Sequence, residues 1–198
     1  GRNDYPERRA RELAQAGYAA FALDMYGDKK TATDPQTATS YMMATFAEPN
    51  IIVDRATAAL NTIAIQPEVD AEQIAIIGFC YGGKVALDLA RSGADVKVVA
   101  TFHANLSAQS PAQKGSFKAE VLVAHAGDDS MVSLEDVAQF KAEMQQAEVT
   151  HHVEIYPNTK HGFTNPAADE KAKTYGVDLG YNPDSEQAAL NALYQLLA

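Results

Sequence analysis

The sequence predicts an α/β fold, a three-layer sandwich with helices on both faces of a mostly parallel central sheet. Three short, continuous apolar segments carry this prediction, because strands buried on both faces of a parallel sheet have this composition. They are 73–78 (QIAIIG), 96–102 (VKVVATF) and 121–127 (VLVAHAG). Helical patterns alternate with apolar segments along the chain, which is the arrangement that builds such a sandwich.

Helices and one strand are expected before the first of these segments. Pro6 suits the first turn of a helix that Gly17 ends, and Asn50 is expected to cap a helix with apolar residues at near-helical spacing. Residues 28–49 are otherwise polar and irregular. The expected elements are a helix from about Pro6 to Gly17, a strand over 18–27, a helix around 37–46 and a helix over 51–66.

The rest of the chain alternates strands and helices. A helix over 81–91, closed by Gly93, follows the first buried strand, and helix 134–147 follows the third. A strand over 151–157 and a last helix from about 184 complete the pattern. In a sheet of this kind ligands bind beyond the carboxyl ends of the strands, so we look for chemistry there.

Length, charge and cysteine content exclude several classes of protein. The 198 residues are enough for one domain, and no apolar stretch has the length of a membrane span. The net charge of −10 and the lack of a basic cluster argue against nucleic-acid binding. A single cysteine cannot form an intramolecular disulfide, which favours a reducing compartment, so we expect a cytoplasmic location. We also expect a monomer or a homodimer.

The cysteine lies in the sequence Gly78-Phe79-Cys80-Tyr81-Gly82, between an apolar strand and a helix. A sharp strand-to-helix turn of this type presents its central residue at the top of the sheet and leaves room only for small residues two positions before and after. The helix N-terminus favours a thiolate there, and the backbone N–H of Tyr81 would form half of an oxyanion hole. The alternative is that Cys80 is an inert core residue and the glycines serve packing.

A thiol nucleophile needs a base and an acid that orients the base. Both are expected on loops after later strands, in the order nucleophile, acid, histidine. Asp128 and Asp129 directly follow the strand over 121–127, and His161 lies in the loop after the next strand. Order and placement therefore predict a site at the carboxyl edge of the sheet.

The other four histidines are weaker candidates. His125 lies within a strand, and His151 and His152 lie at the beginning of the strand over 151–157, at the opposite end of the sheet. His103 follows the strand over 96–102, so it is a candidate pocket residue. A zinc site from His125, Asp129 and His161 lacks a compact ligand motif, and we expect neither a metal nor a cofactor.

The chain resembles the dienelactone hydrolase family of α/β-hydrolases, whose nucleophile is a cysteine. Four stretches carry the resemblance: QAGYAAFALDMYG, IAIIGFCYGGKVAL, HAGDDSMVS and YPNTKHGF. The resemblance implies a triad of Cys80, His161 and Asp129, because the family's acid is followed three residues later by a valine, here Val132. It also implies that the family's first strands, its second oxyanion donor and a glutamate that pairs with the thiol precede Gly1. We therefore expect a single α/β-hydrolase domain over 1–198 that lacks its N-terminal strands.

The same resemblance guides the substrate prediction. Family members that act on dienelactone bind its carboxylate with arginines, whereas residues 28–49 contain none and Asn165 lies where the second is expected. We therefore predict neutral, fairly hydrophobic esters or lactones, cleaved through a thioacyl-enzyme. The predicted contacts to substrate come from five residues: Tyr41, Met43, His103, Phe163 and Asn165.

Three alternatives stay open. The aromatic and methionine side chains around Tyr41 equally suit the burial of their own helix. The same cysteine would also serve a metal-independent hydrolase of activated phosphotriesters, because an oxyanion hole can meet the charged oxygen on phosphorus. The third alternative is a non-catalytic relative that binds a small molecule or a partner.

Overall fold

The computed structural model describes residues 1–48 and 50–198, and the chain divides into two compact units, 1–71 and 72–198. The first unit contains helices α1 (Asp4–Gln15), α2 (Pro35–Ala44) and α3 (Ile51–Ala64). All three were expected, and local capping explains two of them: the side chains of Asn3 and Asp34 accept backbone N–H groups at the starts of α1 and α2. Asn50 occupies the cap position of α3, but its side chain makes no capping hydrogen bond.

The predicted strand over 18–27 is wrong. These residues have no regular secondary structure, and the Phe21 side chain is 51% exposed. The carboxylate of Asp24 accepts hydrogen bonds from three backbone N–H groups of the following turn, which fixes a loop. An apolar run becomes a strand only when a neighbouring strand pairs with its backbone, and the described part of 1–71 contains no strand.

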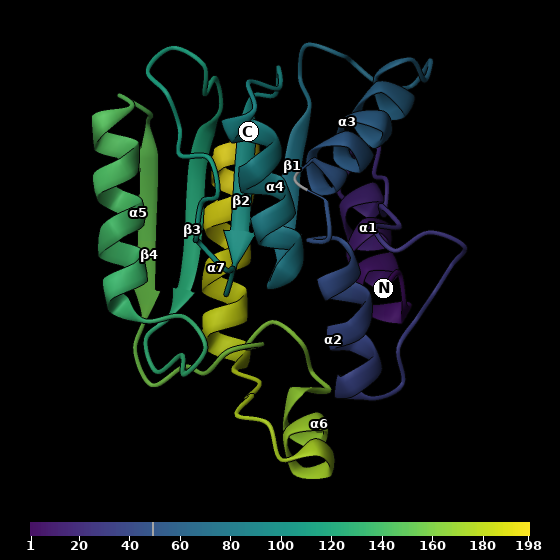
Figure 1. Cartoon of the computed structure of the whole chain (residues 1–198), viewed down its shortest axis with the longest axis vertical. Coiled ribbons are helices and arrows are strands. Elements are labelled where there is room, and N and C mark those ends of the chain that lie inside the picture. The colour runs from purple at the N-terminus through teal and green to yellow at the C-terminus, as the bar shows by residue number, and fades with distance from the viewer. Residues whose placement is uncertain (49) are drawn as a thin grey trace. The chain divides into compact units, whose positions relative to one another are not determined.

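The second unit contains a four-stranded parallel sheet in the order β1-β2-β3-β4 (Figure 1). The strands are β1 (Ala75–Phe79), β2 (Val98–Phe102), β3 (Glu120–Ala126) and β4 (His151–Tyr156). Phe79 pairs with Phe102, and Phe102 with Ala124, so the carboxyl ends of the first three strands meet at one edge. β1 is only partly buried because it lies at the edge of the sheet, which corrects the expectation that segment 73–78 is buried on both faces.

Helices cover both faces of this sheet and confirm the three-layer prediction. α4 (Tyr81–Arg91) connects β1 to β2 and α5 (Leu134–Gln146) connects β3 to β4; right-handed crossovers place both on one face. α7 (Pro183–Leu197) packs against β2 and β3 from the other (Figure 1). The short, polar α6 (Ala168–Tyr175) was not predicted. Across the described residues, no helix combines the length and the apolar character needed to cross a membrane.

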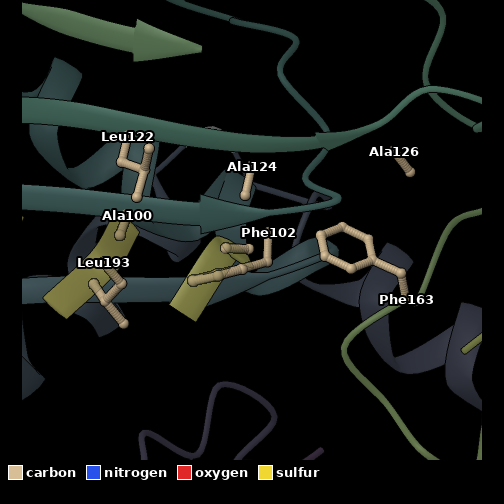
Figure 2. Close-up of a cluster of buried hydrophobic side chains, with 8 residues drawn as sticks. Ala100, Phe102, Leu122, Ala124, Ala126, Phe163 and Leu193 are labelled. Atoms are coloured by element: carbon tan, nitrogen blue, oxygen red, sulfur yellow. The ribbon is translucent and has the colours of Figure 1, made fainter. Parts of the chain in front are cut away.

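The core between the sheet and α7 is built from alternate positions of the strands, whose side chains point to the same face (Figure 2). Phe102 and Phe163 are its largest members, and both are completely buried. The cluster consists of Ala100, Phe102, Leu122, Ala124, Ala126, Phe163, Ala189 and Leu193. This packing brings residue 163 beneath the carboxyl edge of the sheet, where the predicted site lies.

A buried charge network fastens the loop after β2 to α4 and α5. The Arg91 guanidinium donates to both carboxylate oxygens of Glu143, each at 2.8 Å, and to the backbone oxygens of Leu106 and Ser107. Glu143 also accepts from the Ala112 N–H at 2.8 Å. The side chains of Arg91 and Glu143 are only 2% and 13% exposed, so each depends on the other to offset its lost hydration.

Candidate active site

Cys80 forms the turn between β1 and α4 and has φ 51° and ψ −116°. Positive φ is uncommon for residues other than glycine, so the surrounding structure must impose it. The Cys80 N–H donates to the Phe102 oxygen at 3.0 Å, and the Gly83 N–H donates to the Cys80 oxygen at 3.1 Å. Among the described residues Cys80 is exposed, which argues against the alternative of a buried packing cysteine.

The glycines around Cys80 have different roles from those expected. A Cβ atom on Gly78 would lie 2.2 Å from the Gly82 backbone oxygen, so Gly78 is required for the close approach. Apart from its chain neighbours and the nearby backbone of α4, a Cβ atom on Gly82 would meet no described atom within 4 Å, which corrects the expectation that both flanking glycines are sterically required. The second close contact is at Gly83, where a Cβ would lie 2.3 Å from the Ala104 Cβ.

Asp129 and His161 are brought together on the loops after β3 and β4. His161 Nδ1 lies 2.8 Å from Asp129 Oδ2, and the two side chains are 5% and 0% exposed. The other carboxylate oxygen of Asp129 accepts the N–H groups of Met131 at 2.8 Å and Val132 at 3.0 Å. Asp128, in contrast, is exposed, so Asp129 is the acid that contacts the histidine.

The electrostatics of the pair favour two opposite charges. Burial lowers the pKa of His161, but the hydrogen bond to Asp129 and the interaction with Cys80 outweigh it and raise the value to about 10. Burial raises the pKa of Asp129, but the hydrogen bond and charge of His161 and two backbone N–H groups hold it below the ordinary value. His161 Nε2 is buried and meets the hydrogen-bond criteria with no described atom. Nε2 is therefore the nitrogen left for proton transfer.

The remaining histidines have distinct surroundings. His103 directly follows β2, is buried, and places Nε2 3.0 Å from the Thr164 Oγ1, a partner that sequence patterns did not indicate. His125 is buried in β3, and burial lowers its pKa. His151 and His152 form the first residues of β4. Within residues 1–48 and 50–198, no group of three or more His, Cys, Asp or Glu side chains is arranged to hold a metal.

The other predicted substrate contacts are placed as follows. Phe163 is completely buried in the core cluster, which argues against direct contact with a substrate. Asn165 is partly buried, and its side-chain oxygen accepts the Ala167 N–H at 3.1 Å, which closes a turn. Tyr41 and Met43 belong to α2 in the first unit, where the Tyr41 ring packs on Tyr26 and Met43 is 55% exposed. Their contact with substrate stays a prediction.

Comparisons with known proteins show which family and which solved structures this chain resembles. The model of the dienelactone hydrolase family matches residues 1–198. The solved structure of m3DLH is 38% identical with a TM-score of 0.91, over 100% of this chain and 81% of that one. The structure of P91, described as a dienelactone hydrolase-like promiscuous phosphotriesterase from metagenomic libraries, is 35% identical with a TM-score of 0.90 and the same coverage.

Curated relatives are more distant in sequence. A protein from Bradyrhizobium sp. named "Probable 2-oxo-3-(5-oxofuran-2-ylidene)propanoate lactonase" is 28% identical over 96% of this chain and 76% of its own length. A relative from Salmonella typhi is 26% identical over 77% of this chain, and the match spans only 60% of that relative's length. The similarity to solved structures thus extends over the whole chain and exceeds the similarity to these relatives.

Proposed function

The chain belongs to the dienelactone hydrolase family, and on that premise we propose that it hydrolyses carboxylic esters or lactones with Cys80 as the nucleophile. His161 and Asp129 complete the triad. The observation that supports this most is the buried His161–Asp129 pair, whose histidine is also raised in pKa by the exposed Cys80. Packing alone requires neither a strained, exposed cysteine nor a buried ion pair beside it.

The proposed mechanism uses the thiolate of Cys80 as the nucleophile and the protonated His161 as the acid, with Asp129 charged beside it. The Cys80 thiolate attacks the carbonyl carbon, and the carbonyl oxygen becomes an oxyanion; the N–H of Tyr81, at the start of α4, is its predicted donor. The protonated His161 gives its Nε2 proton to the leaving oxygen as the tetrahedral intermediate collapses to a thioester. The neutral imidazole then takes a proton from water, which attacks the thioester and releases the acid and Cys80. Asp129 keeps the Nδ1 proton in place throughout.

We further propose that the substrates are neutral. An anionic substrate needs fixed positive charge, but the net charge of the chain is −10. Residues 28–49 contain no arginine, and Asn165 lies where the second carboxylate-binding arginine is expected. Three arginines of α1 are already engaged by two glutamates of the same helix. The kcat/KM for a neutral p-nitrophenyl ester or lactone should therefore exceed that for dienelactone. Efficient turnover of dienelactone would overturn this part of the proposal.

Single substitutions test the proposed triad with matched controls. Cys80→Ala and His161→Ala should abolish hydrolysis of a p-nitrophenyl ester, with folding checked by circular dichroism. His152→Ala is the control for the second variant, because His152 is exposed and binds Glu120 at the amino end of β4. Unchanged turnover by Cys80→Ala would refute the proposed function.

Hydrolysis of activated phosphotriesters is a second candidate activity, favoured by the 35% identity to P91 over the whole chain. The covalent intermediate would then be a thiophosphoryl enzyme formed by the same attack of Cys80. Comparison of kcat/KM for diethyl p-nitrophenyl phosphate and for p-nitrophenyl acetate, which share a leaving group, decides which activity dominates. Both activities should be fully retained in the presence of a metal chelator. A cytoplasmic location and a monomer or homodimer stay predictions.

A further inference from the structure

His103 occupies a backbone position that links the nucleophile turn to β3. The peptide group between Phe102 and His103 accepts the Cys80 N–H on its oxygen at 3.0 Å and donates its N–H to the Ala124 oxygen at 2.9 Å. His103 has φ 40°, a strained region for a non-glycine residue that persists only where the surrounding structure imposes it. The backbone of His103 is therefore fixed relative to both Cys80 and β3.

The His103 side chain makes three contacts with the segment that carries the proposed base. Its ring centroid lies 4.9 Å from that of His161 in an edge-on arrangement, with 61° between the ring planes. Nε2 lies 3.0 Å from the Thr164 Oγ1, and the Phe163 ring packs edge-on at 5.4 Å. His103 is 4% exposed, and Phe163 and Thr164 are completely buried. The histidine loop is thus anchored on His103.

The hydrogen bond that the His161 Nδ1–H donates to Asp129 does not by itself fix the imidazole. One hydrogen bond at Nδ1 still allows the ring to swing about that contact, which would carry Nε2 away from Cys80. The edge of the His103 ring restricts this motion, because His103 is itself held by its own backbone and by Thr164. Asp129 and His103 therefore both contact the His161 ring.

We propose that His103 is a positioning residue that holds the His161 imidazole in place for Cys80, with Thr164 locking His103. This inference rests on the proposed function, and it gives His103 a role behind the proposed base in place of the predicted contact with substrate. Loss of the support should lower kcat by about 10- to 100-fold, since a displacement of about 1 Å at a reacting group has effects of this size. KM should change little, because His103 is buried and does not bind the substrate.

Loss of the contact with His103 should also change the pH dependence of the reaction. The pKa of His161 is raised by its contacts with Asp129 and Cys80, so a displaced ring should titrate at lower pH. The basic limb of the kcat/KM profile reports loss of the His161 proton and should shift to lower pH. Histidine NMR follows the same titration without any need for turnover.

The test uses Thr164→Val, which removes the hydroxyl at nearly constant volume, and His103→Ala, which removes the ring. Thr164→Ser keeps the hydroxyl and should restore the wild-type kcat and pH profile. Thr101→Val is the matched control, because Thr101 is also completely buried and donates to the Leu122 oxygen at 3.4 Å, away from the His161 loop. Thermal unfolding of every variant separates loss of stability from loss of positioning.

We expect Thr164→Val and His103→Ala to lose kcat and shift the His161 titration, while Thr101→Val does neither. A wild-type kcat and titration in Thr164→Val would overturn the inference, and that variant decides the matter if His103→Ala fails to fold. Cys80→Ala is measured in parallel. Retained turnover in Cys80→Ala refutes the proposed function, whereas the NMR titration of His161 tests the positioning by His103 in either case.

Discussion

Substitution of a single glycine tests how the turn presents Cys80. An alanine Cβ at position 78 would lie 2.2 Å from the Gly82 oxygen, 2.4 Å from its carbon and 2.5 Å from the Gly83 nitrogen. All three are backbone atoms, so the turn must open by about 1 Å to reach an ordinary contact, and a displacement of this size costs about 100-fold in rate. Overpacking of a rigid site lowers the free energy of unfolding by about 1–3 kcal/mol, and we expect the upper end for Gly78→Ala.

Gly82→Ala is the matched control, since it makes the same chemical change four residues later. Apart from its chain neighbours and the nearby backbone of α4, its Cβ would meet no described atom within 4 Å, and alanine favours a helix over glycine by about 1 kcal/mol. Urea unfolding followed by circular dichroism, together with hydrolysis of a p-nitrophenyl ester, measures both effects. Gly78→Ala should lose stability and activity, and Gly82→Ala should keep both. Equal behaviour of the two variants would refute the steric account of this turn.

Three further predictions concern the buried charges. Asp129→Asn should lower kcat on the order of 10³- to 10⁴-fold, because the amide misorients His161, while Asp128→Asn leaves kcat unchanged; steady-state kinetics compares the two. The free energy of unfolding should fall as pH rises from about 6.5 to about 10, because His161 binds its proton more tightly folded than unfolded. Urea unfolding at several pH values in this range measures how steeply the free energy of unfolding falls with pH. An equally steep fall in Asp129→Asn would contradict the assignment of this pH dependence to the His161–Asp129 pair. Arg91→Met should destabilise the fold by about 3–5 kcal/mol, since it leaves the Glu143 carboxylate buried without its partner; thermal unfolding tests this.

Local sequence patterns were enough to predict those parts of the structure that depend on residues close together in the sequence. The helix over 81–91 was predicted at its observed bounds, because an apolar strand, a tight turn and a small-residue helix follow one another directly. Asp129 and His161 were placed correctly at the carboxyl edge because parallel strands bring successive loops to that edge. The choice between Asp128 and Asp129 needed the family resemblance, since both acids follow β3.

Contacts between distant segments could not be predicted in this way. The stretch 18–27 is apolar enough for a strand, but strand formation depends on a pairing partner that the stretch itself does not encode. The contact of His103 with Thr164 joins residues 61 positions apart, and no motif connects them. The need for glycine at 83 arises from Ala104 on another segment, so the motif around Cys80 did not reveal it.

The site of covalent attachment during turnover tests the central claim most directly. The wild-type chain and Cys80→Ala are mixed with a neutral p-nitrophenyl ester, quenched in acid during the first turnover, and mapped by peptide mass spectrometry. We predict an acyl group on the peptide that contains Cys80, formed with a burst of p-nitrophenolate, and neither burst nor adduct in Cys80→Ala. Turnover that continues in Cys80→Ala, or an acyl group on any other residue, would contradict the proposed mechanism.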